Sequence, residues 1–252
     1  MSDLTVQRFR SRDGVELAWR EIGDGPPVVL LHGLLGTGAL MADSGLAVAI
    51  AGRGHRVILP DLRGHGDSGR PHDPASYPQD ILADDLLALI DHLGLDGYSL
   101  AGYSLGGKLV LRLLARGARP GRAVVAGQGL DALNAESDRT DGHRRVLAAV
   151  ANGDSFAPGS PDESFAAWIT QSGADPVAVG SVLNTFVATP REALGLVPVP
   201  TLVVVGDGDT RGASAGELAD LLPNGQVVIV PGDHGTAFLA TEFTDAVVNF
   251  LG

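Results

Sequence analysis

The sequence predicts a three-layer α/β domain in which helices cover both faces of a mostly parallel, eight-stranded sheet. Eight short apolar segments with β character recur along the chain, and helical patterns separate the later ones. The first two, 5–9 and 15–21, alternate between polar and apolar residues, as half-exposed edge strands do. Inner segments such as 27–31 and 201–206 are continuously apolar, which is typical of parallel strands buried on both faces. Strands that alternate with helices indicate a parallel sheet between two helical layers.

The other elements follow the same alternation. The four remaining strands are expected at 56–60, 98–101, 122–126 and 226–231. The clearest helical pattern covers 78–93, and its apolar face consists of Leu82, Leu86, Leu89 and Leu93. Two further helices are expected at 105–116 and 236–251.

Residues 128–198 break this alternation, because they contain no strand pattern. Two capping-box motifs, Ser160-Pro-Asp-Glu163 and Thr189-Pro-Arg-Glu192, predict helix starts within the segment. An insertion of roughly 70 residues is too long for an ordinary connection. We therefore expect residues 128–198 to form a helical lid inserted after the sixth strand. Residues 1–127 and 199–252 then form the core.

Composition and charge exclude several classes of function. The chain has 252 residues, no cysteine and a formal net charge of −12. The absence of cysteine excludes disulfides, thiolate nucleophiles and cysteine-bound metal sites, and the negative charge argues against nucleic acids and anionic membranes. With neither a signal-peptide pattern nor a long apolar run, we expect a cytoplasmic protein with a small-molecule substrate. No cofactor or metal is expected, and monomer and homodimer remain open.

The strongest motif is Gly102-Tyr-Ser-Leu-Gly106, which follows the strand predicted at 98–101 and opens a helix. A serine on such a sharp turn projects its hydroxyl from the top of the sheet, where it can act as a nucleophile. The residues two before and two after it must lie against neighbouring backbone, where a side chain would clash. Ser104 is therefore the candidate nucleophile.

A serine hydroxyl needs a base, and the base needs a carboxylate to orient it. His234 lies in a glycine-flanked loop between the last predicted strand and the last helix. Asp209 and Asp207 both follow the strand at 201–206, and we favour Asp209 because it lies further beyond the strand end. Asp207 is expected to be a turn residue, and Asp131 is an outside candidate for the acid.

The negative oxygen of a tetrahedral intermediate requires preorganised N–H donors. One donor is expected to be the backbone N–H of Leu105, immediately after the nucleophile. The other is expected from the loop after the third strand, where the N–H of Leu34 is favoured. His32 in that loop is expected to fix its conformation by hydrogen bonding.

Five segments resemble those of the α/β-hydrolase superfamily in order and spacing: 31–33, 61–68, 102–107, 206–209 and 232–234. The resemblance covers essentially the whole chain and implies the α/β-hydrolase fold, with the lid at 128–198. It implies that the segment 61–68 is structural, so that His65 braces loops near the site. Because the candidate nucleophile is serine and not aspartate, the chain resembles the esterase and lactonase branch of the superfamily.

The expected reaction is hydrolysis of a small to medium, neutral, modestly hydrophobic ester, lactone or thioester. Ser104 forms an acyl-enzyme, His234 is the general base and Asp209 orients it. The lid carries nine acidic residues against four arginines, which disfavours a polyanionic substrate. Its apolar side chains suggest an apolar pocket. The residues expected to line this pocket are Leu35, Tyr103, Phe156, Trp168 and Phe186.

Other activities on the same fold stay open. The elbow at 102–108 is also similar to that of the menaquinone-pathway lyase that eliminates pyruvate, in which serine acts as a base. Enol-lactonases and cofactor-free perhydrolases are further neighbours that the sequence does not separate. A non-catalytic ligand receptor is the third alternative, although an intact Ser, Asp and His in order count against a decayed scaffold.

Overall fold

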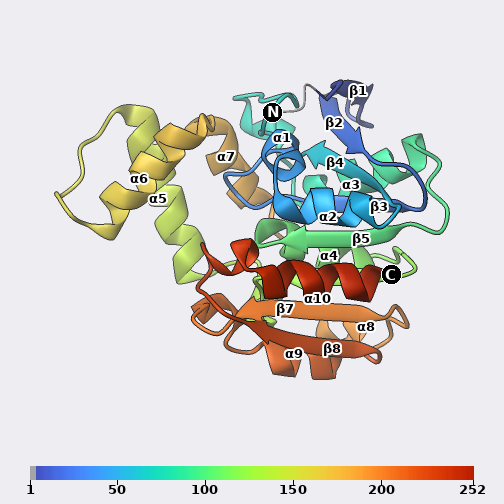
Figure 1. The fold of residues 1–252 in the computed structure, drawn as a ribbon. Helices are drawn as coiled ribbons and strands as arrows, with labels where there is room; N and C mark the ends of the chain where they lie inside the picture. The colour runs from blue at the N-terminus through green and yellow to red at the C-terminus, as the bar shows by residue number, and fades with distance from the viewer. Residues whose placement is uncertain (1–3) are drawn as a thin grey trace.

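A computed structural model describes residues 4–252, and Figure 1 shows a single twisted sheet with helices on both faces. The sheet has eight strands in the order β1-β2-β4-β3-β5-β6-β7-β8. Strand β2 pairs antiparallel with β1 and β4, and all the other pairs are parallel. The strands are β1 (Gln7–Arg10), β2 (Glu16–Ile22), β3 (Pro27–Leu31), β4 (Arg56–Asp61), β5 (Ser99–Tyr103), β6 (Ala123–Ala126), β7 (Thr201–Gly206) and β8 (Gly225–Val230).

Two helical layers cover the sheet, so its central strands are buried on both faces. One layer contains α1 (Gly38–Ala42), α2 (Gly45–Gly52) and α10 (Thr241–Leu251). The other contains α3 (Ile81–His92), α4 (Leu105–Ala115), α8 (Arg191–Leu194) and α9 (Ala215–Leu221). Along β3, Val28 and Leu30 pack into the first layer, and Val29 and Leu31 pack into the second. This alternation explains why inner strands such as β3 and β6 are apolar at every position.

The predicted strands lie within two residues of the observed ones, but two helices begin later than expected. The helix expected at 78–93 begins at Ile81, because Asp80 has a left-handed backbone with φ of 68°. The helix expected at 236–251 is interrupted after a 3₁₀ turn over Ala237–Leu239. Ala240 is extended there, and α10 begins at Thr241.

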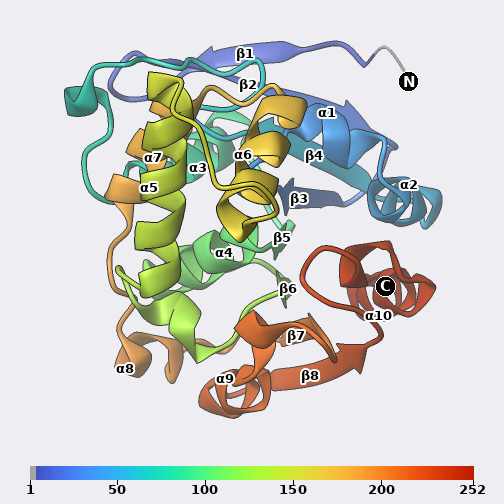
Figure 2. The ribbon, with the colours of Figure 1, turned by 90° about the vertical axis from the view of Figure 1, so that its left-hand side faces the viewer.

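Residues 128–198 contain helices and no strand, as expected. They form η2 (Leu130–Leu133), α5 (Asp138–Asn152), α6 (Pro161–Ser172), α7 (Pro176–Val182), η3 (Leu183–Thr185) and α8. Figure 2 shows α5, α6 and α7 gathered at one edge of the sheet, and Ala178 and Val182 of α7 also pack into the core of the second helical layer. These three helices share a small apolar core, to which Leu147 and Ile169 contribute fully buried side chains.

The two predicted helix starts have different outcomes. Ser160 caps α6, and its side chain accepts a hydrogen bond from the Glu163 N–H at 3.1 Å, so this prediction is confirmed. A helix also starts at the second motif, because α8 begins at Arg191, but the expected cap is absent: the N-cap residue is Pro190, no side chain caps the helix, and Thr189 is buried. Within residues 4–252, no helix has both the length and the apolar character that crossing a membrane requires.

Candidate active site

Ser104 lies on the turn between β5 and α4, with φ of 55° and ψ of −112°. Only one other non-glycine residue in the described part of the chain, Asp80, has a positive φ. The turn depends on two glycines that flank the serine. A Cβ on Gly102 would lie 2.3 Å from the carbonyl carbon of Gly106, and one on Gly106 would lie 2.4 Å from the Leu31 oxygen. The steric requirement predicted from the motif is therefore met in the fold.

The imidazole of His234 lies between Ser104 and Asp209. Its Nε2 is 2.9 Å from the Ser104 Oγ, and its Nδ1 is 2.7 Å from Oδ2 of Asp209. The other carboxylate oxygen of Asp209 accepts the backbone N–H of Arg211 at 2.9 Å. Burial opposes ionisation of Asp209, but the hydrogen bond and charge of His234 outweigh it and hold the Asp209 pKa below its usual range. The carboxylate can therefore fix the imidazole tautomer with Nδ1 protonated.

The two alternative acids lie elsewhere. Asp207 is exposed, and its Oδ1 accepts the Gly232 N–H at 3.0 Å, which ties β7 to the loop that carries His234. It therefore has the turn role expected for it. Asp131 lies in η2, on the wall of the cavity in front of Ser104. Of the three aspartates, Asp209 is the one bonded to His234.

Tyr103 holds the His234 loop from behind. Its hydroxyl donates a hydrogen bond to the His234 carbonyl, and the two rings are 5.3 Å apart. Burial raises the pKa of this phenol, so it remains protonated and keeps its donor. Tyr103 is therefore a positioning residue for His234.

The expected oxyanion donors lie beside the serine. Leu34 and Leu105 both line the cavity together with Ser104. Within residues 4–252, neither backbone N–H donates to a protein acceptor, which leaves both for a ligand oxygen. Gly33 packs against the serine, since a Cβ there would lie 3.5 Å from the Ser104 Cβ.

Two buried histidines hold the loop that contains Leu34. The Nδ1–H of His32 donates to the Gly33 carbonyl at 2.7 Å, and its Nε2 accepts the Leu62 N–H at 3.1 Å. Complete burial, reinforced by the neighbouring His65, lowers the pKa of His32 to about 3 and keeps it neutral. His65 contacts the Leu34 carbonyl through Nε2 at 2.6 Å. Both histidines thus brace loops, as expected.

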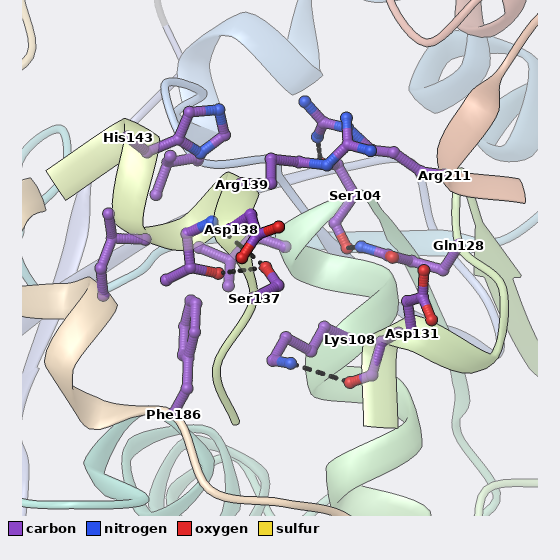
Figure 3. Close-up of a pocket in the computed structure, with 15 residues that line it drawn as sticks. Ser104, Lys108, Gln128, Asp131, Ser137, Asp138, Arg139, His143, Phe186 and Arg211 are labelled. Atoms are coloured by element: carbon purple, nitrogen blue, oxygen red, sulfur yellow. Dashed lines mark hydrogen bonds between the residues drawn. The ribbon is translucent and has the colours of Figure 1, made fainter. Parts of the chain in front are cut away.

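A cavity of about 310 Å³ opens in front of Ser104, between α4 and the start of α5 (Figure 3). Of the five side chains predicted to line it, only Phe186 does. Leu35 and Phe156 instead pack into the core of α5, α6 and α7, Trp168 is exposed on α6, and Tyr103 lies behind His234. The prediction failed because two of these side chains pack into the core of the helical segment, one faces solvent and one lies behind the base.

The expectation of an apolar, neutral pocket is also wrong. The cavity is lined by Lys108, Arg139 and Arg211, against two carboxylates, Asp131 and Asp138. Other acidic groups of the segment pair with different arginines at the surface, as Asp162 does with Arg145. The acidic composition of residues 128–198 therefore does not describe their inner surface. The argument that an acidic segment 128–198 disfavours a polyanionic substrate, and with it the lyase alternative, therefore no longer holds.

Arg211 is the main feature that the sequence reasoning missed. Its Nη1 lies 2.7 Å from Nε2 of His234 and 3.2 Å from Oγ of Ser104. Burial, together with the charge of Arg139, lowers the pKa of Arg211 to about 10, so it remains cationic at neutral pH. An always-charged guanidinium has only donors, so Nε2 must be the acceptor in this contact. The only feature of the sequence that could have indicated Arg211 was its position two residues after Asp209.

Lys108 and Gln128 complete the polar wall. The Lys108 ammonium donates to the carbonyls of Ala132, at 2.8 Å, and Asn134, and lies 5.1 Å from the centre of the Phe186 ring. Burial lowers its pKa to about 8. Gln128 donates to the Ser104 carbonyl at 2.6 Å and so holds the strained turn from the β6 side.

Comparisons with known proteins agree on one family. Residues 26–146 match the family model described as alpha/beta hydrolase fold. The chain is 31% identical to the non-heme chloroperoxidase CPO-A1 of Kitasatospora aureofaciens, over 96% of this chain and 98% of that one.

Solved structures give the same result over nearly the whole chain. A bromoperoxidase from Bacillus anthracis is 29% identical, with a TM-score of 0.76 over 98% of this chain and 99% of that one. The enol-lactonase from Burkholderia xenovorans LB400 is 26% identical, with a TM-score of 0.73 over 97% and 99%. The chain therefore belongs to the α/β-hydrolase superfamily and is an enzyme of the hydrolase type.

Proposed function

We propose that the protein is a serine hydrolase that cleaves a carboxylic ester or lactone through an acyl-enzyme on Ser104. The observation that carries this proposal is the continuous hydrogen-bonded chain from Ser104 through His234 to Asp209, set on a strained turn. The likeness to an enol-lactonase supports a carbonyl substrate in which a C–O bond is cleaved.

In the first half-reaction, Oγ of Ser104 attacks the substrate carbonyl and its proton passes to Nε2 of His234. Asp209 stabilises the imidazolium that forms, while remaining ionised itself. The tetrahedral intermediate collapses when the C–O bond to the alcohol breaks, and the alcohol leaves with the proton from His234. In the second half-reaction, water attacks the acyl-enzyme, His234 takes a proton from it, and the acid is released as Ser104 regains its proton.

The negative oxygen of both intermediates is bound by the N–H groups of Leu34 and Leu105. Their lack of other acceptors supports this role. Donors of this kind are worth about 3–4 kcal/mol each to the transition state. The first turn of α4 adds the positive end of its helix dipole beneath the same oxygen.

The segment 128–198 acts in this proposal as a lid over the active site. Three of its features support the assignment: α5 and α6 lie outside the two layers, α5, α6 and α7 share a core of their own, and the start of α5 forms one wall of the cavity. Substrate choice therefore depends on residues such as Arg139 and Phe186, which the lid supplies.

The names of two full-length relatives favour a second nucleophile for the same acyl-enzyme. Because these relatives are named a chloroperoxidase and a bromoperoxidase, hydrogen peroxide is the second candidate to attack it in place of water. That step would release a peracid and free Ser104. Assays with and without peroxide, with peracid measured directly, separate the two outcomes.

The proposed function is tested with p-nitrophenyl acetate and butyrate and with a fluorophosphonate probe. We expect ester turnover in the parent, none in Ser104→Ala, and a covalent adduct on Ser104 identified by mass spectrometry. Absence of Ser104-dependent turnover of every short ester, lactone and thioester tested would sink the proposal. A folded protein that shows neither adduct nor turnover would instead favour the non-catalytic ligand receptor or the pyruvate-eliminating lyase.

A further inference from the structure

Two arginines from distant parts of the chain meet above the nucleophile. Arg211 comes from the loop after β7 and Arg139 from the first turn of α5, and Figure 3 shows both side chains above Ser104. Their proximity is also seen in the pKa of Arg211, which is lowered first by burial and then by the charge of Arg139. Arg211 is partly buried and Arg139 is exposed, so solvent screens part of their repulsion, and an anion bound between them would remove the rest.

The protein itself supplies no such anion at close range. Among residues 4–252, no carboxylate oxygen lies within 4.0 Å of either guanidinium, although many other arginines are so paired. The Nε of Arg211 is buried and has no hydrogen-bond partner. Its Nη1 is bound only to His234 and Ser104, the two groups that must be free to react. Within residues 4–252, Arg211 therefore has one donor without a partner, Nε, and one donor, Nη1, at the reaction centre.

We propose that Arg139 and Arg211 bind a carboxylate on the acyl part of the substrate, so that the enzyme hydrolyses half-esters of short dicarboxylic acids or small lactones that carry a free carboxylate. This inference rests on the proposed acyl transfer at Ser104. A guanidinium fork matches the two oxygens of a carboxylate. With three cations and two carboxylates, the cavity has a formal excess of one positive charge, which suits a singly charged group.

The contacts of Arg211 also limit the spacing between the two ends of the substrate. Because Nη1 lies 3.2 Å from the Ser104 Oγ, the bound carboxylate must lie only a few carbon atoms from the carbonyl under attack. A cavity of about 310 Å³ lies at the small end of the range for ligand pockets and has room for such an acyl group. Acyl chains of four to six carbons, about the length of succinate to adipate, meet both conditions.

Binding of the carboxylate would also activate the base. In the free enzyme, the N–H of Arg211 competes with the Ser104 hydroxyl for the single lone pair on Nε2 of His234. A carboxylate that accepts the N–H groups of Arg211 in place of His234 leaves Nε2 to accept the proton from Ser104. His234 must accept a proton again during deacylation, when only the acyl group is still bound. This requirement places the carboxylate on the acyl part.

The test compares ethyl hydrogen glutarate with ethyl valerate, which has the same acyl chain length but ends in a methyl group. Acid release is followed in a pH-stat. We expect kcat/KM for the half-ester to exceed that for ethyl valerate by about tenfold or more. Arg139→Gln should lower the half-ester value roughly 10- to 100-fold, the usual effect of a charged hydrogen bond, and change the ethyl valerate value less than about twofold. Arg145→Gln on the same helix, an exposed arginine paired with Asp162, is the matched control and should change neither.

A binding measurement separates failure of this inference from failure of the proposed function. Ethyl hydrogen glutarate is titrated by calorimetry into Ser104→Ala, which cannot form an acyl-enzyme, and into the same protein carrying Arg139→Gln. Saturable binding that weakens about tenfold or more with Arg139→Gln supports the carboxylate site even if no ester is turned over. Ser104-dependent hydrolysis without any preference for the half-ester, or binding unaffected by Arg139→Gln, overturns the inference and leaves the hydrolase assignment standing.

Discussion

Arg211 contacts one ring nitrogen of His234 directly and is linked to the other through Asp209. Its backbone N–H donates to Asp209, which in turn binds Nδ1, while its guanidinium Nη1 lies 2.7 Å from Nε2. One residue thus helps to position the acid and, in the free enzyme, occupies the nitrogen that must accept the proton from Ser104. The backbone contact supports the proposed triad, whereas the side-chain contact opposes it until a ligand accepts the N–H that is bonded to Nε2.

Replacing Arg211 by methionine should separate these two effects, because the backbone N–H remains and the charged donor is lost. We expect Arg211→Met to raise kcat/KM for ethyl valerate by about twofold or more and to lower it for ethyl hydrogen glutarate. The comparison requires steady-state kinetics on both esters with the same enzyme preparation. Equal losses on both esters would show that the guanidinium assists the chemistry directly.

The choice of acid is tested by two matched substitutions. Asp209→Asn should lower kcat roughly 10⁴-fold, because the amide cannot hold the imidazole in the required tautomer. Asp207→Asn should lower kcat less than about tenfold, because Asp207 only accepts the Gly232 N–H. Kinetics with p-nitrophenyl butyrate, together with circular dichroism to verify folding, decide the matter. The opposite order of effects would move the role to Asp207.

The strained turn predicts a strong requirement for glycine at position 106. In Gly106→Ala the new Cβ would meet the Leu31 carbonyl oxygen at 2.4 Å, so we expect a loss of about 3 kcal/mol or more in the free energy of unfolding. Gly142→Ala is the control. Gly142 lies inside α5 with open space around it, and its replacement should raise stability by up to about 1 kcal/mol. Urea denaturation of both variants provides the measurement, and similar midpoints for the two would contradict the steric argument.

Removal of the Tyr103 hydroxyl is expected to have a smaller effect on stability and on kcat. Tyr103→Phe removes the hydrogen bond to the His234 carbonyl but keeps the ring that packs against Phe238 and Phe243. We expect a loss of about 1 kcal/mol in stability and a fall in kcat with little change in KM, since the loop that carries the base is loosened. An unchanged kcat would show that the loop is held by its other bonds.

Lys108 should make stability depend on pH above neutrality. Burial lowers its pKa from 10.5 to about 8, so between these values the unfolded chain binds more protons than the folded one. The free energy of unfolding therefore rises with pH in that window. Relative to Lys108→Met, which has no titrating group there, the parent should gain about 1–3 kcal/mol between pH 7 and pH 10. Urea titrations at several pH values measure the difference in free energy of unfolding between the parent and Lys108→Met. A difference that does not change with pH would contradict the prediction.

Local patterns along the chain were sufficient to predict the sheet, the turn at Ser104 and the partners His234 and Asp209. Runs of apolar residues mark buried strands whatever their neighbours are, and glycines mark the places where backbone segments approach closely. Strand ends in a parallel sheet share one edge, so residues after β5, β7 and β8 could be expected to meet there.

The lining of the cavity was decided only in three dimensions. The sequence predicted Phe156 and Trp168 as pocket residues. In the structure, Phe156 packs into the core of α5, α6 and α7, and Trp168 faces solvent. Arg139 and Arg211 are 72 positions apart and have no shared motif, and they meet because α5 docks beside the loop after β7. Which side chain reaches a cavity depends on how helices dock and on the direction of each Cα–Cβ bond. Long-range packing determines how the helices dock and where each Cα–Cβ bond points, and a local sequence pattern predicts neither.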